Sequence, residues 1–332
     1  MNNKHIIYTK PGNVDVLKMI EAPVSVLNSN EVLVQISAAG VAYGDILLRT
    51  GVSPGAKFPI TPGYDIVGKV VATGPHVHRF KAGDYVRSYC ETRGYSTYIC
   101  LPESKLVMVP THLKPPAAVS VILNYTTAYD LLIKIAKLKK GDTALIYGAA
   151  GGVGTAMLQL AKVYGIKIFG SVSTSKIEVV EKAGGIPIDY TQKNLVEEIK
   201  RLTGSGVDAV FDPIAGSNLY VSNKVLNKNG TLVLFGASSA VAGNGNAALK
   251  LLKAMLPFMF LKITLNNKHY KIAGKKTDIN EDIALMFKLL AEGKITPLTA
   301  NTFPLKDAAK AQIMLENDRP AGKIVLDFDA DH

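Results

Sequence analysis

A glycine-rich turn between an apolar strand and a helix constrains this chain more than any other feature. Residues 147–154 read Tyr-Gly-Ala-Ala-Gly-Gly-Val-Gly and follow the apolar run Ala144–Ile146 directly. Gly151 leaves room for a pyrophosphate to approach the backbone, and Gly154 lets the next helix pack close to the strand. The N-terminus of that helix adds unpaired N–H groups and a partial positive charge. Ala149 stands where the strict pattern has its first glycine, so the motif predicts a slightly altered dinucleotide-binding turn. An unliganded tight turn is the alternative.

The regions around this turn alternate between strand and helix. This alternation predicts an α/β fold with a doubly wound parallel sheet over residues 124–270. Residues 1–123 instead carry short β-rich runs between glycines and prolines, which is typical of an antiparallel, partly open barrel. A helix is expected at 283–291 and a strand at 323–328, so residues 271–332 are assigned to the first domain. Strands are expected at 143–147, 166–172, 209–212 and 231–236, and helices at 126–135, 153–164 and 176–182.

The segment after the second expected strand bears on which dinucleotide binds. An NAD site usually places Asp or Glu about 20 residues after the glycine turn, to hold the ribose 2′-hydroxyl. Residues 170–176 read Gly-Ser-Val-Ser-Thr-Ser-Lys and contain no acid. Ser173 and Lys176 suit a 2′-phosphate as hydrogen-bond donor and counter-charge. Tyr190, after the third strand, is placed to stack on the adenine or reach the phosphate. NADPH is therefore the expected coenzyme, with a solvated Lys176 as the alternative.

Composition and charge restrict the class of protein further. The chain has 332 residues, enough for two domains, and only two cysteines, Cys90 and Cys100, which exclude a disulfide framework. Its net charge of +11 leaves nucleic acid, a membrane surface and an anionic small molecule open as partners. The N-terminus lacks the apolar run of a signal peptide, so we expect a cytoplasmic protein. The apolar stretch 251–265 is too short to span a bilayer and is interrupted by Lys253, Pro257 and Lys262. We expect a buried helix or a subunit contact there, with a peripheral membrane contact as the alternative.

Seven short motifs resemble the medium-chain dehydrogenase/reductase superfamily, in its zinc-independent quinone oxidoreductase-like branch. They occur in order over nearly the whole chain, so the resemblance is specific. It implies a GroES-like catalytic domain, a Rossmann domain, and a homodimer paired through the Rossmann sheets. The motifs lie at residues 39–45, 62–68, 83–86, 125–129, 148–154, 235–238 and 321–326.

The chain departs from the zinc alcohol dehydrogenases of that superfamily. Ala42 stands where those enzymes place the first catalytic cysteine, and Tyr64 replaces the histidine of their Gly-His-Glu segment. Leu123 stands at the third ligand position. Catalytic zinc needs three protein ligands and an open position. His76-Val77-His78 lies in a turn without a third ligand nearby in the sequence, so we predict no metal.

Without zinc, reduction of a conjugated C=C–C=O is easier than oxidation of an alcohol. Hydride adds to the β-carbon or the quinone ring, and the resulting enolate oxygen needs hydrogen bonds and a proton, which water can supply. The expected substrate is a small apolar quinone or enone. By resemblance, the catalytic residues are Tyr43, Tyr64 and Asn124, with Arg49 as a nearby cation. The expected coenzyme-binding residues are Thr127, Ala150, Gly151, Gly152, Val153, Ser173, Lys176, Tyr190, Phe235, Gly236, Ala237 and Lys323.

Two other functions stay open at this point. A 2-enoyl thioester reductase of the same branch would carry a tyrosine just after Gly51, where this chain has Val52. A non-catalytic protein that binds NADPH or RNA is the third interpretation. The basic residues of the chain are dispersed apart from 137–140 and 275–276. No basic run alternates with aromatic residues as in RNA-binding surfaces. We therefore expect no nucleic-acid or membrane partner.

Overall fold

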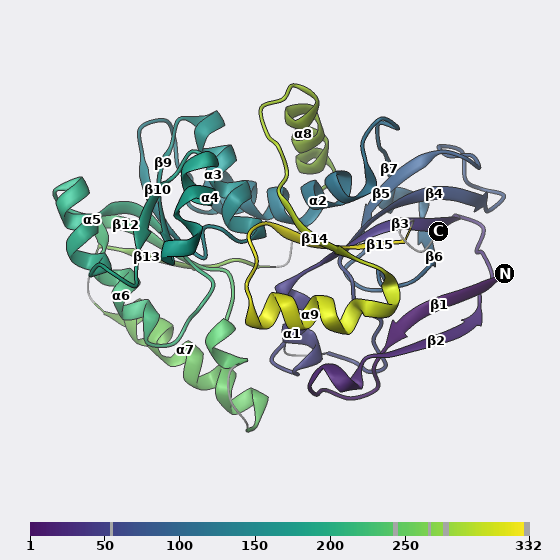
Figure 1. Cartoon of the computed structure of the whole chain (residues 1–332), viewed down its shortest axis with the longest axis horizontal. Coiled ribbons are helices and arrows are strands. Elements are labelled where there is room, and N and C mark those ends of the chain that lie inside the picture. The colour runs from purple at the N-terminus through teal and green to yellow at the C-terminus, as the bar shows by residue number, and fades with distance from the viewer. Residues whose placement is uncertain (54–55, 242–244, 265–266, 275–278, 329–332) are drawn as a thin grey trace. The chain divides into compact units, whose positions relative to one another are not determined.

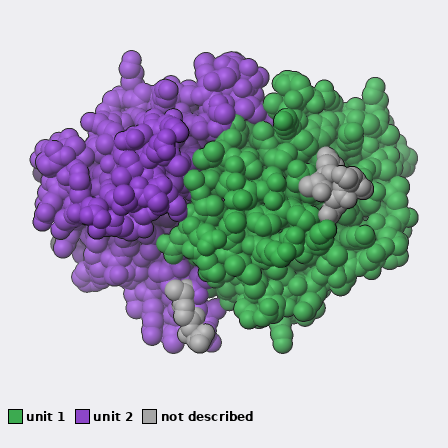
Figure 2. Space-filling view, viewed as in Figure 1, with its two compact units in different colours: residues 1–123, 297–332 green, residues 124–296 purple. Residues whose placement is uncertain are grey.

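The computed structural model describes residues 1–53, 56–241, 245–264, 267–274 and 279–328. It divides the chain into two compact units (Figure 2). Unit 1 comprises Met1–Leu123 and Pro297–His332, and unit 2 comprises Asn124–Thr296. The basic pair 275–276 singled out in the sequence lies outside the described residues. The described helices include none that is long and apolar enough to cross a bilayer.

Unit 1 is the GroES-like domain and is built from both ends of the chain. Its described residues form a seven-stranded sheet in the order β14-β15-β3-β4-β5-β7, with β6 paired to β3. A separate antiparallel pair, β1 and β2, completes its strands (Figure 1). The elements are β1 (Asn2–Ile7), β2 (Lys18–Pro23), β3 (Glu31–Val41), α1 (Tyr43–Arg49), β4 (Asp65–Thr73), β5 (Tyr85–Tyr89), β6 (Tyr98–Pro102), β7 (Val107–Met108), β14 (Thr299–Phe303), α9 (Ala308–Asn317) and β15 (Lys323–Asp327).

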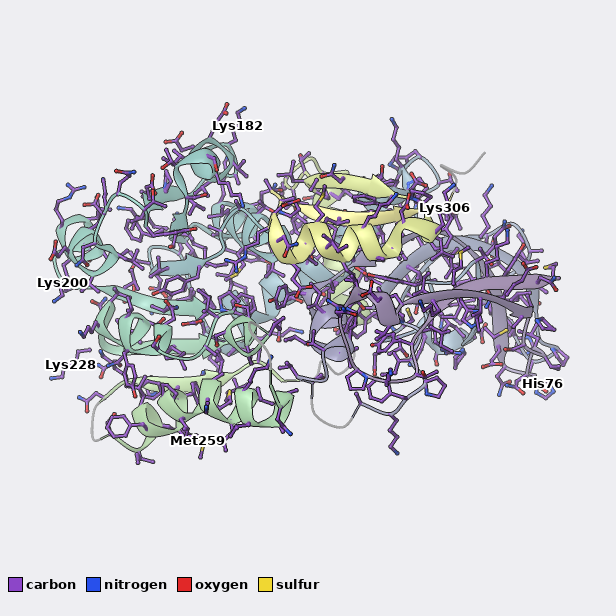
Figure 3. All side chains as sticks on the ribbon, turned by 60° about the horizontal axis from the view of Figure 1, so that its bottom comes forward. His76, Lys182, Lys200, Lys228, Met259 and Lys306 are labelled. Carbon is purple, nitrogen blue, oxygen red and sulfur yellow. The ribbon has the colours of Figure 1, made fainter. Side chains whose placement is uncertain are left out.

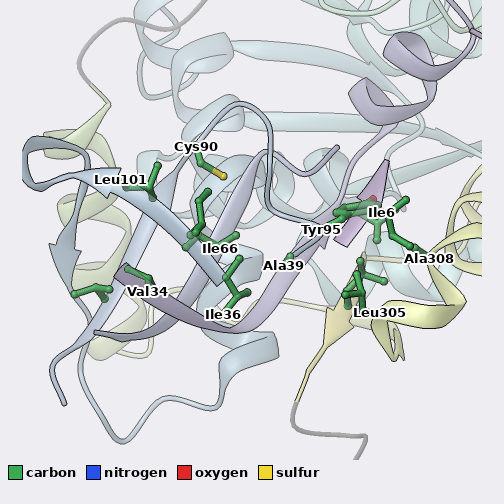
Figure 4. Packing of buried hydrophobic residues seen from close by; sticks show 14 of the residues in the cluster. Ile6, Val34, Ile36, Ala39, Ile66, Cys90, Tyr95, Leu101, Leu305 and Ala308 are labelled. Atoms are coloured by element: carbon green, nitrogen blue, oxygen red, sulfur yellow. The ribbon is translucent and has the colours of Figure 1, made fainter. Parts of the chain in front are cut away.

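The core of unit 1 joins its two chain segments. Ile6 and Tyr95 of the first segment belong to the same buried cluster as Leu305 and Ala308 of the last segment (Figure 4). β15 pairs antiparallel with β3, so the last strand lies next to the longest strand of the sheet. The two segments therefore share one hydrophobic core.

Unit 2 is the Rossmann domain. Its described residues form a six-stranded sheet in the order β10-β9-β8-β11-β12-β13, and every pairing in it is parallel. Helices pack against this sheet, in the α/β architecture that the alternation predicted (Figure 1). The elements are α2 (Pro115–Tyr129), which contains the boundary between the units, a π-helix (Asp130–Ile135), β8 (Thr143–Tyr147), α3 (Gly152–Tyr164), β9 (Lys167–Val172), α4 (Ile177–Lys182), β10 (Ile186–Asp189), α5 (Leu195–Thr203), β11 (Val207–Asp212), α6 (Asn218–Lys224), β12 (Leu226–Leu234), α7 (Ala247–Ile263), β13 (His269–Ile272) and α8 (Asn280–Ala291).

The second boundary lies later than the sequence suggested. The chain leaves unit 2 after Thr296 and not after residue 270. β13 adds to the sheet by pairing with β12, and Lys134 of the π-helix forms an ion pair of 2.6 Å with Asp282 of α8. Both contacts join residues that are distant in sequence, so local pattern did not reveal them. The helix expected at 126–135 also begins earlier, because α2 starts at Pro115 and continues into the π-helix.

Candidate functional site

The glycine-rich turn has the conformation that the motif predicts. β8 ends at Tyr147, Gly148 has a positive φ of 67°, and the Gly151 N–H donates to the Gly148 carbonyl at 3.0 Å. A Cβ on Gly154 would lie 2.4 Å from the carbonyl oxygens of both Gly148 and Ala149. That distance is shorter than any tolerable contact, so only glycine lets the first turn of α3 sit on this loop.

The N-terminus of α3 has the features of an anion-binding site. Gly151 is its N-cap residue and provides no side-chain cap. A Cβ built on Gly151 would meet only the Gly148 carbonyl, at 3.3 Å, so little else crowds the space where a side chain would stand. The first N–H groups of a helix need partners, and a phosphate can supply them. The predicted residues Ala150, Gly151, Gly152 and Val153 all lie in this turn, and they fit a coenzyme pyrophosphate.

The loop after β9 holds Ser173 and Lys176 as expected, but an acid lies beside it. The Thr174 hydroxyl donates to Asp189 at the end of β10, and Thr191 donates to the same carboxylate through its N–H and its hydroxyl. These hydrogen bonds lower the pKa of Asp189, which is therefore ionised. The NAD pattern places its acid directly after the second strand of the sheet, whereas Asp189 comes one strand later in the sequence, so the pattern does not predict it.

The remaining residues of unit 2 that are predicted to bind the coenzyme lie at the same sheet edge. Phe235 follows β12, and its N–H donates 3.0 Å to the Asp212 carbonyl. A Cβ on Gly236 would lie 2.7 Å from the Pro213 carbonyl, so this turn also needs glycine. In a parallel sheet the carboxyl ends of all strands meet at one edge, where ligands bind. The described structure therefore gathers the glycine turn, Ser173, Lys176, Tyr190, Phe235, Gly236 and Ala237 there, and Thr127 lies half-buried on α2.

The two predicted tyrosines of unit 1 are half-buried. Tyr43 is the first residue of α1, and Tyr64 directly precedes β4. A Cβ on Gly44 would lie 2.9 Å from the Tyr64 ring, so Gly44 allows that ring to pack against α1. The Tyr64 ring also packs 6.2 Å from that of Tyr89, measured between centroids. Burial raises the pKa of Tyr43 and of Tyr64, so both phenols stay protonated at neutral pH and can donate a hydrogen bond. The third predicted catalytic residue, Asn124, is buried on α2 and belongs to unit 2.

Asp45 positions this part of unit 1. Its carboxylate accepts hydrogen bonds from the Ala42 N–H at 2.9 Å, the Gly63 N–H at 2.9 Å and the Tyr95 hydroxyl at 3.1 Å. The first of these closes the N-terminus of α1, and the second fixes the backbone next to Tyr64. Full burial raises the pKa of Asp45 to about 6 against the effect of these bonds.

Arg49 does not have the role of nearby cation that the resemblance implies. The residue is 1% exposed, and its guanidinium donates to Gln312 at 2.8 Å, to the Gly12 carbonyl at 2.9 Å and to Glu316 at 2.7 Å. Those bonds tie α1 to α9 and occupy the nitrogens Nε, Nη1 and Nη2. Arg49 is therefore a buried cross-link, and the expectation of a cation facing substrate is corrected.

Lys323, expected to bind coenzyme, is also occupied. It is 3% exposed, and its ammonium lies 3.2 Å from a carboxylate oxygen of Asp65, which is itself fully buried. Asp65 also accepts from the Leu123 N–H at 3.2 Å. A Cβ on Gly40 would collide with both members of the pair, so this glycine provides their space. The ammonium neutralises a buried carboxylate of unit 1, and this corrects the coenzyme assignment of Lys323.

The side chains do not fit a zinc ion. The described residues contain no group of three His, Cys, Asp or Glu side chains that could hold a metal. Cys90 donates to the Gly63 and Tyr64 carbonyls, whereas Cys100 donates to the Ser25 carbonyl, so the thiols serve separate backbone sites. Burial raises the pKa of both thiols, which disfavours the thiolate that zinc requires.

Comparison with known proteins agrees with this architecture. Residues 28–111 match the family model of the alcohol dehydrogenase GroES-like domain, and residues 185–326 match that of zinc-binding dehydrogenases. The chain is 30% identical to synaptic vesicle membrane protein VAT-1 of Tetronarce californica, over 96% of this chain and 86% of that protein. It is 27% identical to quinone oxidoreductase of Sus scrofa, over 96% of this chain and 95% of that enzyme. The Escherichia coli quinone oxidoreductase complexed with NADPH superposes with a TM-score of 0.85 at 28% identity, covering 98% of this chain and 99% of that one. The chain therefore belongs to the medium-chain dehydrogenase/reductase superfamily, in its quinone oxidoreductase/VAT-1 branch.

Proposed function

We propose that this protein is an NADPH-dependent reductase of quinones or α,β-unsaturated carbonyls. The observation that carries the proposal is the uncapped N-terminus of α3 behind Gly151, which offers backbone N–H groups to a coenzyme pyrophosphate. Membership of the quinone oxidoreductase branch and the NADPH complex of the Escherichia coli relative support the same coenzyme. Ser173 and Lys176 supply a hydroxyl and a positive charge for the 2′-phosphate.

Unit 1 supplies the groups that act on the substrate. When bound, the nicotinamide ring supplies a hydride to the β-carbon or quinone ring. Tyr43 and Tyr64 are protonated donors, so their hydroxyls can stabilise the enolate or hydroquinone oxygen that carries the resulting negative charge. A water molecule then protonates that product. Asp45 acts as a positioning residue, because its carboxylate holds the backbone next to both tyrosines.

The residues at the metal positions support this reaction over alcohol oxidation. Ala42, Tyr64 and Leu123 stand where zinc dehydrogenases of the superfamily place their ligands, and none offers an imidazole or thiolate. A phenol can donate a hydrogen bond to an enolate, but it polarises an alcohol oxygen poorly. Conjugate reduction therefore suits these side chains better.

A coenzyme-oxidation screen of the full-length protein tests the proposal. We expect NADPH to be consumed with phenanthrenequinone, benzoquinone or octenone, and more slowly with crotonyl-CoA. Tyr64→Phe should lower kcat by about tenfold with NADPH affinity unchanged, since one hydrogen bond to the transition state is worth about that much. Tyr220→Phe, on the exposed surface of α6, is the matched control. Turnover of crotonyl-CoA alone would favour the enoyl thioester reductase, and NADPH binding without turnover of any substrate would contradict a reductase.

Two further expectations concern the assembly and the compartment, and neither depends on the reductase activity. A homodimer and a cytoplasmic location stay predictions, which light scattering and fractionation of the native protein test.

A further inference from the structure

Unit 1 has a pocket of about 390 Å³ that no step of the proposed reaction uses. Its lining residues all belong to the first segment of the chain, so the pocket lies within this unit. Ile7 of β1, Leu48 of α1 and Ile60 contribute apolar side chains to the lining. Pockets for small organic ligands range upward from about 300 Å³, so a small organic molecule fits here.

The polar part of this lining is cationic. Lys57 and Arg93 carry positive charges, and Thr61 and Thr92 supply hydroxyl groups. The described lining residues include no aspartate or glutamate. Both cations are exposed whereas Ile60 is buried, so the charges lie nearer to solvent than this apolar side chain. Apolar lining combined with positive charge matches an apolar molecule that carries a carboxylate.

Positive charge alone would not identify a site in this protein. Exposed lysines such as Lys182, Lys200 and Lys228 project from several places on unit 2 (Figure 3). The pocket of unit 1 differs from these places because two cations share it with apolar side chains. The backbone of one of the two cations supplies a second, independent observation.

Arg93 has a left-handed backbone conformation, with a φ of 75°. Residues with a side chain seldom adopt this conformation, and such strain is concentrated at functional sites. Hydrogen bonds hold the residue on both sides. Its N–H donates to the Thr61 carbonyl at 2.8 Å, and its carbonyl accepts from the Ser96 hydroxyl at 2.6 Å. The arginine side chain therefore leaves the backbone from a fixed position at the pocket.

The loop that carries Arg93 also holds the backbone next to Tyr64. The Glu91 N–H donates to the Tyr64 carbonyl at 3.2 Å, and the Gly94 N–H donates to the Gly63 carbonyl at 3.1 Å. A Cβ on Gly63 would lie 2.7 Å from the Gly94 Cα, so the two backbone segments are in direct contact. Thr61 of the pocket precedes Tyr64 by three residues, which span at most about 10 Å. One extended substrate is therefore long enough to contact both.

We propose that this pocket binds the carboxylate of an apolar quinone or enone whose reacting oxygen contacts Tyr64. The planar guanidinium of Arg93 pairs with the carboxylate, and Lys57 adds a second positive charge. The apolar side chains of the lining pack against the carbon skeleton beside the carboxylate. The proposal rests on the proposed reductase activity and narrows its substrate class to apolar acids.

Two matched substrates test the proposal on the full-length protein. A methylnaphthoquinone that carries a propionic acid side chain and its methyl ester share the reacting ring and differ in charge. We expect kcat/KM with NADPH to be about tenfold higher for the acid, mainly through a lower KM. Arg93→Asn should abolish most of this acid-to-ester ratio, and asparagine tolerates the left-handed backbone, so the loop keeps its conformation. Arg93→Lys keeps the charge and should retain most of the ratio.

The second cation and a control lysine complete the series. Lys57→Gln should lower the acid-to-ester ratio severalfold, since it removes one of the two positive charges of the pocket. Lys306→Gln removes an exposed positive charge from the other chain segment of unit 1 (Figure 3) and should leave the ratio unchanged. The unfolding midpoint of each variant serves as the folding control.

A binding measurement separates this proposal from the reductase activity. Calorimetry without coenzyme uses naphthylpropionic acid and its methyl ester, which offer no quinone to reduce. The acid should bind about tenfold more tightly than the ester, and Arg93→Asn/Lys57→Gln should remove the difference. This result without turnover of either quinone would support the pocket and contradict the reductase. Turnover of both quinones with equal kcat/KM, or a preference for the acid that survives in the double variant, would overturn the pocket.

Discussion

The two units satisfy their buried charges in different ways. In unit 1, Arg49 reaches Gln312 and Glu316, 263 and 267 residues away, and Lys323 reaches Asp65 over 258 residues. In unit 2 the carboxylate of the fully buried Asp212 accepts hydrogen bonds from Ile214, Ala215, Asn218 and Ser222, all within ten residues. Polar cross-links thus join the two segments of unit 1, whereas local turns satisfy the most deeply buried carboxylate of unit 2, that of Asp212.

The difference follows from chain connectivity. Unit 2 is one continuous segment, so each strand is followed closely by the helix that covers it. Unit 1 consists of two segments separated by the whole of unit 2, and its own strands must recruit β15 and α9 from the far end of the chain. Apolar contacts are non-directional, so they tolerate several registers. Arg49 and the Lys323–Asp65 pair add directional contacts, which favour a single register.

The largest effect is expected from breaking a long-range cross-link. Arg49→Met removes the hydrogen bonds to Gln312, Gly12 and Glu316, and leaves buried acceptors without a partner. We expect the free energy of unfolding to fall by about 3–5 kcal/mol, measured by urea denaturation. Lys182→Met breaks the exposed ion pair with Glu178 in unit 2 and should change the free energy of unfolding by less than about 0.5 kcal/mol. Similar losses in both variants would contradict the comparison.

A local backbone contact in unit 2 should matter for coenzyme binding. Gly154→Ala places a Cβ 2.4 Å from two carbonyl oxygens, so the turn must move away from α3. We expect NADPH affinity to fall about 30-fold, equivalent to about 2 kcal/mol, in a fluorescence titration. Gly274→Ala, where an added Cβ meets nothing, is the control. An unchanged Kd for Gly154→Ala would show that this turn does not hold the coenzyme.

Substitution of Asp45 tests whether an ionised carboxylate buried in unit 1 lowers the stability of the protein. Asp45→Asn directs an amide N–H at the Ala42 N–H or the Gly63 N–H, so we expect a loss of about 2 kcal/mol at pH 7. The folded pKa of about 6 lies above the unfolded value of about 3.9, so the folded wild type binds a proton between these pH values. The wild type therefore gains stability relative to the variant as the pH falls from 7 to 4. A stability difference that shrinks over this range would contradict the raised pKa.

The smallest effect concerns coenzyme choice. Lys176→Ala should lower the preference for NADPH over NADH about five- to tenfold by removing the charge opposite the 2′-phosphate. Asp189→Asn should shift the preference a fewfold toward NADPH, because it removes the negative charge beside that loop. The ratio of kcat/KM for the two coenzymes measures both changes. A Lys176→Ala enzyme with an unaltered ratio would remove the lysine from this role.

The sequence predicted what depends on local pattern. The glycine turn and the alternation around it follow from spacing within short segments, and the structure has both of them. The end of unit 2 was placed too early because β13 joins the sheet only through its pairing with β12. Arg49 and Lys323 were misassigned because nothing near them in sequence reveals Glu316 or Asp65 as their partners. Asp189 escaped notice because β9 and β10 bring it to Thr174 across 15 residues.

The split of unit 1 also sets an order of events during synthesis. The ribosome completes residues 124–296 before it makes α9 and β15, so unit 2 has its whole sequence available first. Until then, β3 in the first 123 residues is unpaired along the edge that β15 later covers. The Asp65 carboxylate also lacks the Lys323 ammonium with which it pairs in the folded protein. A chain released before Lys323 would therefore present an open strand edge, which is the kind of surface that chaperones and proteases recognise.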